Sequence, residues 1–182
     1  MTHIAFLRAV NVGGRGLVKM TDLQKAFTAA GAKNVRTVIA SGNVVFEAPG
    51  TLGSLRERIV KKVRPLLGAD PEIAFRTLPY LERMIAAAPF GPLANDRTVK
   101  LYVLFLLGKP KRLPVFPMAI PKEVIEVSGM YEQDALIVSR RKPNGFYGFP
   151  GLWTEKELGV ASTGRNWSTL LRITGPAATV NR

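Results

Sequence analysis

The first part of the chain alternates between strand-like and helix-like segments, and their order limits the fold more tightly than any other property of the sequence. Short runs of β-branched and apolar residues predict strands, and apolar residues three and four positions apart predict amphipathic helices. The predicted order is βαββαβ, which is the arrangement of ferredoxin-like folds. The segments are, in order, residues 4–10, 21–30, 35–39, 44–47, 54–65 and 72–76.

Three capping boxes support the predicted helices. Thr21 with Gln24 and Ser54 with Glu57 each place a hydroxyl residue three positions before a side chain that can bond back to its backbone N–H. A third pair of the same kind, Thr154 with Glu157, predicts a further helix in the second half of the chain.

The second half repeats the first in a looser form. Residues 99–107 predict a central strand, whereas the four prolines of residues 109–121 disfavour a regular helix there. A hairpin is predicted around Ser128-Gly129-Met130, and a last helix over residues 167–173. The sequence therefore predicts an α+β protein with two similar ferredoxin-like subdomains, residues 1–90 and 91–182.

Composition excludes several classes of site. The 182 residues contain no Cys and a single His, His3. Thiolate metal sites, iron–sulfur clusters and cysteine nucleophiles are therefore excluded, and Ser-His-Asp relays lack a mid-chain base. The acidic residues show no spacing typical of a metal site, so we expect neither a metal nor a cofactor.

Charge points to an anionic partner. The chain carries 26 Lys+Arg against 13 Asp+Glu, a formal net charge of +13. The excess is +7 before and +6 after residue 90, so it is spread along the chain rather than held in a tail. Such a field attracts polyanions, nucleic acid above all, although simple solubility is an equally ordinary reason for it. The early Arg8 and the short apolar runs predict a cytoplasmic protein with no membrane partner.

Two groups of residues are candidates for binding. In the first group, a glycine-rich loop after the first strand, a Ser-Gly-Asn segment and the start of the last helix offer donors for a small anion; the alternative is ordinary turns and caps. These residues are Arg8, Asn11, Gly13, Gly14, Ser41, Asn43, Arg165 and Asn166. In the second group, cations are followed by aromatic rings, a mixture suited to phosphates and unpaired bases; the alternative is a hydrophobic plug. These residues are Arg140, Arg141, Lys142, Phe146 and Tyr147.

Several motifs resemble one family. They are residues 8–14 (RAVNVGG), 18–20 (VKM), 34–37 (NVRT), 41–46 (SGNVVF) and 165–169 (RNWST). Together they are similar to the DUF1697 family of bacterial proteins of unknown function. The resemblance implies a duplicated ferredoxin-like fold and no established catalytic residue.

Three functions follow as hypotheses. The first is a module that binds nucleic acid or another polyanion through its basic surface. The second is an enzyme or sensor for a small anionic, phosphorylated metabolite, and the third is a structural interaction protein whose motifs lock the fold. Neither a catalytic residue nor an oligomeric state follows from these patterns.

Overall fold

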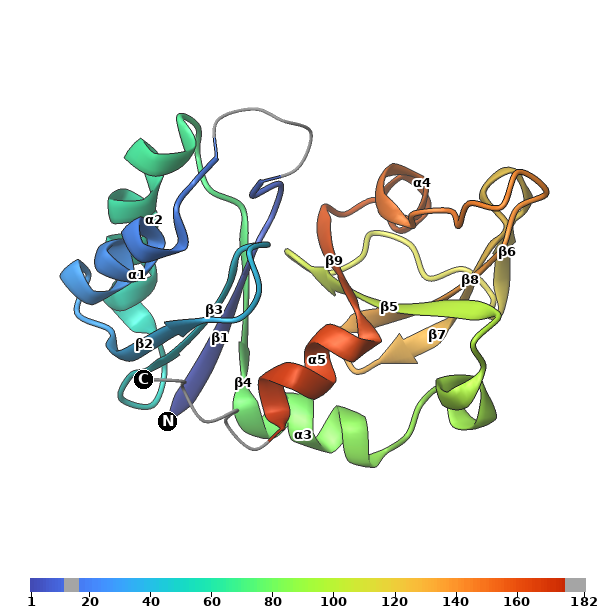
Figure 1. The fold of residues 1–182 in the computed structure, drawn as a ribbon, viewed down its shortest axis with the longest axis horizontal. Coiled ribbons are helices and arrows are strands. Elements are labelled where there is room, and N and C mark those ends of the chain that lie inside the picture. Colours follow the sequence, from blue (N-terminus) through green and yellow to red (C-terminus); the bar gives the residue numbers. More distant parts are fainter. Residues whose placement is uncertain (12–16, 176–182) are drawn as a thin grey trace. The chain divides into compact units, whose positions relative to one another are not determined.

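The computed structural model describes residues 1–11 and 17–175. The chain divides into two compact units, Met1–Tyr80 and Leu81–Arg182. The division falls inside helix α3 (Leu78–Ala86), which leads from one unit into the next. Each unit is built on its own antiparallel sheet (Figure 1).

Unit one has the ferredoxin-like order that the sequence predicts. Its sheet is antiparallel, with the strand order β2-β3-β1-β4, and Figure 1 shows α1 and α2 side by side on one face of it. The elements are β1 (Thr2–Leu7), α1 (Met20–Ala29), β2 (Lys33–Thr37), β3 (Asn43–Glu47), α2 (Gly53–Leu67) and β4 (Ile73–Thr77).

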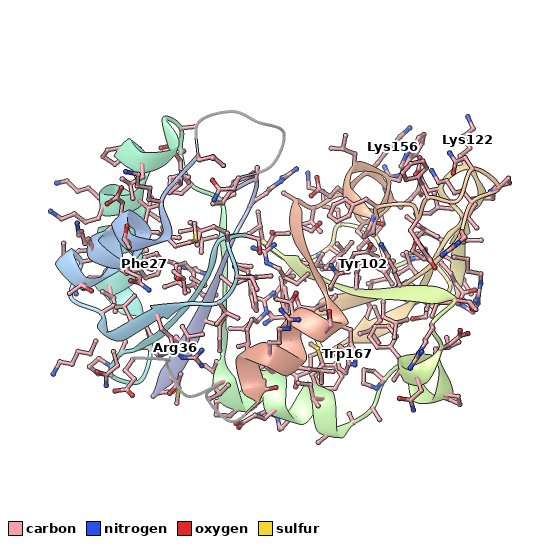
Figure 2. The ribbon with its side chains drawn as sticks, viewed as in Figure 1. Phe27, Arg36, Tyr102, Lys122, Lys156 and Trp167 are labelled. Carbon is pink, nitrogen blue, oxygen red and sulfur yellow. The ribbon has the colours of Figure 1, made fainter. Side chains whose placement is uncertain are left out.

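Alternation along the strands places the core of unit one under its helices. Ala5 and Leu7 of β1 share a buried cluster with Phe27 of α1 and Ile59 of α2. Phe27, labelled in Figure 2, lies edge-on to Phe46 of β3, with the two ring centroids 5.4 Å apart. Burial of these apolar faces, rather than helix propensity, stabilises the two helices.

Unit two has the same strand order with one helix missing. Its sheet runs β6-β7-β8-β5-β9, so β7-β8-β5-β9 corresponds to β2-β3-β1-β4 of unit one. The elements are β5 (Val99–Leu106), β6 (Met118–Ile120), β7 (Ile125–Tyr131), β8 (Asp134–Arg140), α4 (Gly151–Leu158), β9 (Ser162–Asn166) and α5 (Trp167–Thr174), with short 3₁₀ turns at Gly91–Asn95 and Pro121–Glu123.

The missing helix is the one that the prolines of residues 109–121 disfavour. The connection from β5 to β7 contains only the short strand β6 and a 3₁₀ turn. Phe116 and Met118 from this connection pack against the core formed by Tyr102, Leu104 and Leu158. A single short helix, α4, therefore lies on the sheet face that two helices cover in unit one, and part of that face is left to loop segments.

The structure corrects several local expectations. α1, α2 and α4 begin at Met20, Gly53 and Gly151, and none of them has a side-chain cap hydrogen bond, so the three predicted capping boxes are wrong. The second hairpin turns at residues 132–133, because β7 continues through a bulge between Val127 and Gly129.

Candidate functional site

The candidate residues of unit one hold two neighbouring loops to each other. The amide nitrogen of Asn11 donates to the carbonyl oxygens of Val18 at 3.1 Å and Ala40 at 3.2 Å. Its side-chain oxygen accepts a hydrogen bond of 2.8 Å from the Val18 backbone nitrogen. All of the described bonds of the Asn11 side chain are therefore made to the protein backbone, and they tie the loop after β1 to the loop before β3.

The Ser-Gly-Asn segment closes the same pair of loops. Asn43 is fully buried, and its amide nitrogen donates to the Val38 carbonyl oxygen at 2.9 Å and to the Ser41 hydroxyl oxygen at 3.0 Å. Gly42 adopts a φ of +72°, and a Cβ on it would lie 3.0 Å from the Val10 side chain. The glycine is required both by this conformation and by the close approach of the loops.

Three residues of these two loops have left-handed backbone conformations, as do four other non-glycine residues of the described chain. Ala9, Asn11 and Ile39 adopt φ values of +56°, +57° and +51°, in the left-handed region that residues with a side chain rarely occupy. Such strain persists only where surrounding contacts impose it, and it is frequent at functional sites. Arg8 at the same edge forms an ion pair with Glu72, with 3.1 Å between Nη1 and Oε2. Gly13 and Gly14 lie outside the described residues.

Arg165 and Asn166 belong to unit two, where they occupy β9 rather than the first turn of the last helix. Arg165 is only 8% exposed, and its Nη1 donates to the Thr163 hydroxyl at 2.7 Å and to the Gly164 carbonyl oxygen at 2.8 Å. Burial lowers the pKa of the Arg165 guanidinium to about 10. Asn166 is exposed and precedes α5 without a side-chain cap bond, so the adjacent residues Arg165 and Asn166 differ in burial.

Residues 140–149 of unit two form a compact hairpin, here called the basic hairpin. Arg141 and Tyr147 form an isolated antiparallel bridge, and the Lys142 backbone nitrogen donates to the Phe146 carbonyl oxygen at 2.7 Å. Gly145 supplies the turn with a φ of +83°. The predicted cations and rings are therefore presented by an ordered turn.

Two contacts fix the end of the basic hairpin to the sheet. The Ser139 hydroxyl donates to the Gly148 carbonyl oxygen at 2.8 Å. Gly148 is buried, and a Cβ on it would collide with the carbonyl oxygen of Glu123. Lys142 adds an ion pair to the Glu123 carboxylate at 2.7 Å, which removes this lysine from the set of unpaired cations.

Cations gather around one tyrosine ring of the basic hairpin. Lys100 Nζ lies 4.6 Å and Arg141 Cζ lies 5.5 Å from the centroid of Tyr147. The Tyr147 hydroxyl donates to the Thr98 carbonyl oxygen at 3.3 Å, so the ring is held at both ends. Among the described residues, Lys100, Arg140 and Arg141 form no salt bridge, and all three are exposed.

The Asp96 carboxylate adds a negative charge to this positive surface. Hydrogen bonds from Thr98, and to a smaller degree the charge of Arg140, lower the pKa of Asp96. Asp96 is therefore ionised at neutral pH and partly offsets the positive charge near Arg140.

Sequence reasoning missed Lys100, which lies 40 residues before the hairpin in the chain. The signal was present, because Lys100 is a lone cation within the otherwise apolar strand β5. Alternation puts it on the same sheet face as Tyr102 and Leu104, which belong to the core beneath α4. A charge at the end of such a face marks the point where the face meets solvent.

Two features are absent from the described part of the chain. Residues 1–11 and 17–175 contain no group of acidic or histidine side chains arranged to hold a metal ion. Within the same residues, no helix has the length and apolar character needed to cross a membrane.

Comparison with known proteins supports the fold and the family. Among solved structures, the conserved bacterial protein SP0830 from Streptococcus pneumoniae superposes with a TM-score of 0.60 at 19% identity, covering 95% of this chain and 96% of that one. At this identity the likeness concerns the fold alone. No curated protein matches the sequence.

A family model described as "Protein of unknown function (DUF1697)" matches residues 1–133. The match spans unit one and reaches the turn between β7 and β8, ending before the basic hairpin. It therefore covers the two strained loops but neither the hairpin nor Arg165. Because the match extends over well more than half of the sequence, this chain belongs to the DUF1697 family, whose function is unknown.

Proposed function

We propose that the protein binds nucleic acid, or another polyanion of similar charge spacing, through the basic hairpin of unit two. The observation that carries the proposal is the set of exposed cations Lys100, Arg140 and Arg141 beside an ordered turn, with no salt bridge to neutralise them. Because the hairpin is anchored by Gly148 and Ser139, little order has to be gained on binding.

The charge of the whole chain acts in the same direction. A formal net charge of +13 attracts polyanions at long range, and the local cations then contact individual phosphates. A chain without cysteine also suits the reducing cytoplasm, where nucleic acids are abundant partners.

A small anionic metabolite held by the unit-one loops is the second candidate function. Backbone strain at Ala9, Asn11 and Ile39 favours it. We rank it second because the described bonds of the Asn11 and Asn43 amides are made within the protein, and Arg8 is paired with Glu72. Those same contacts also suit a purely structural role for the motifs.

The test is fluorescence anisotropy of a labelled single-stranded oligonucleotide across a salt series, using nuclease-treated full-length protein. Three phosphate contacts give a slope of log K against log salt of about −2, since each contributes about −0.7 with single strands. Replacing both Arg140 and Arg141 by Ala is expected to reduce the magnitude of the slope by about 1.4.

A matched control removes the same charge elsewhere. Lys61 and Lys62 are exposed on α2 of unit one, so the double replacement by Ala leaves the hairpin intact. Equal losses in the two double variants would show that only net charge matters. No binding by the wild type even at low salt would overturn the proposal, and it would favour the metabolite or structural alternatives.

A further inference from the structure

The last residue of the basic hairpin, Phe149, is an exposed phenylalanine on the unit-two sheet. Phe149 is 59% exposed, yet its ring is not loose: it lies edge-on to Tyr102, with centroids 5.7 Å apart and planes at 83°. Tyr102, labelled in Figure 2, is itself buried on β5. Two residues earlier along each segment, Tyr147 lies against Lys100, so residues 147–149 follow the direction of β5.

A glycine in the neighbouring strand makes room for this ring. A Cβ on Gly164, in the middle of β9, would lie 3.2 Å from Cζ of Phe149 and 3.1 Å from Cδ2 of Leu104. Glycine weakens a strand interior, and its presence there often marks a close approach by another group. Here the approaching group is the tip of the Phe149 ring, and the ring fits because Gly164 has no side chain.

The rings of the hairpin have different surroundings. Two cations already occupy the neighbourhood of the Tyr147 ring, and its hydroxyl is bonded to Thr98. Phe146 is 72% exposed and Phe149 is 59% exposed. Both follow Arg140 and Arg141 in the sequence of the hairpin, and these are cations that would contact phosphates. An exposed, positioned ring beside a cation is the arrangement by which single-stranded nucleic acid is bound through its bases.

We propose that Phe146 and Phe149 are base-stacking residues, so that the basic hairpin binds unpaired nucleic acid in preference to polyanions that lack bases. The inference rests on the proposed function and narrows its ligand class. Tyr147 then has a different role from the one expected from sequence, since it positions Lys100 and Arg141 rather than receiving a base. Tyr102 and Gly164 hold the Phe149 ring in its orientation.

Two probes separate this inference from the proposed function. One is a short single-stranded deoxythymidine oligomer, and the other is inorganic polyphosphate of comparable charge, which offers phosphates without bases. We expect Phe149→Ala and Phe146→Ala each to weaken oligomer binding about tenfold, with polyphosphate binding changed less than twofold. Leu152→Ala is the matched control, because Leu152 is a 76% exposed apolar side chain on α4 without a ring.

A third variant tests the positioning of the ring without removing it. Gly164→Ala forces the Phe149 ring tip or the Leu104 side chain to shift by a few tenths of an ångström. With an oligomer carrying 2-aminopurine, whose fluorescence falls on stacking, we expect weaker quenching in Gly164→Ala and unchanged quenching in Leu152→Ala. Circular dichroism melts of all variants check that each remains folded.

The outcomes are distinct. Oligomer-selective loss in both phenylalanine variants supports the inference. Unchanged oligomer binding in both variants, or an equal loss with the two probes, overturns the inference about base stacking. Neither result contradicts the proposed function, which is binding of a polyanion by the basic hairpin. If the wild type binds neither probe at low salt, the proposed function fails and this inference fails with it.

Discussion

At the scale of single residues, the surroundings of His3 disfavour the protonated form of its ring. It is 4% exposed in β1, its ring stacks on Phe46 with centroids 5.6 Å apart, and its Nε2 is buried without a described hydrogen-bond partner. Burial lowers the pKa of His3 below its ordinary value of 6.5, although a hydrogen bond with the Gly50 backbone opposes this effect. The folded state therefore prefers the neutral ring.

This preference predicts how stability changes with pH. The unfolded chain takes up a proton at His3 near pH 6.5, whereas the folded chain does so only at lower pH, so the free energy of unfolding falls as the pH drops below 6.5. The loss ends once the pH passes below the folded pKa. Urea titrations from pH 7.5 to 4.5 are expected to show this fall in the wild type and a flatter profile just below pH 6.5 in His3→Gln. Parallel profiles for the two proteins would contradict the assignment.

At the scale of elements, the sequence predicted the order of strands and helices but not their caps and turns. The order follows from apolar periodicity, which burial enforces, and the proline-rich connection behaved as expected because proline cannot continue a helix. The capping boxes failed because each helix begins before its Ser or Thr. The second turn was misplaced because a bulge at Gly129 carries β7 onward to Tyr131.

The residues of the candidate site that are close together in the sequence could be predicted, whereas those brought together by strand pairing could not. Arg140, Arg141, Phe146 and Tyr147 were recognisable because a hairpin is local in sequence. Lys100 and Gly164 join them only through the pairing of β5 with β8 and β9, which composition does not reveal. The unit-one motifs were recognised as a group, but their mutual hydrogen bonds depend on side-chain packing.

The anchoring of the basic hairpin gives an element-scale prediction. Gly148→Ala places a methyl group against the Glu123 carbonyl, so the hairpin must move, and we expect a loss of about 1–3 kcal/mol in stability. Tyr147 then leaves Lys100, and affinity for the oligomer falls severalfold. Thermal melting and anisotropy measure the two effects.

Gly129→Ala is the control for that variant. Gly129 lies in β7 of the same unit, and a Cβ on it meets nothing within 4 Å. It is expected to melt close to the wild type and to bind normally. Normal oligomer binding by Gly148→Ala would mean that the position of the hairpin is irrelevant to the ligand.

At the scale of the whole molecule, the structural difference between the two units is the reason why we propose binding by unit two. Both units share one strand order, but unit one covers its sheet face with α1 and α2, whereas unit two lacks the counterpart of α1. Tyr147 and Phe149 lie against this face of the unit-two sheet, at Lys100 and Tyr102. The net charge of +13 is spread over both units and supplies attraction without choosing a site.

The most direct test of this account is a chemical-shift map of the isotope-labelled full-length protein titrated with a single-stranded oligonucleotide. We predict that the shifts concentrate on residues 97–102, 140–149 and 164, while α2, which is equally basic and exposed, stays unperturbed at moderate salt. Shifts centred instead on Asn11 and residues 41–43 would place the ligand at the strained loops of unit one and contradict the central claim.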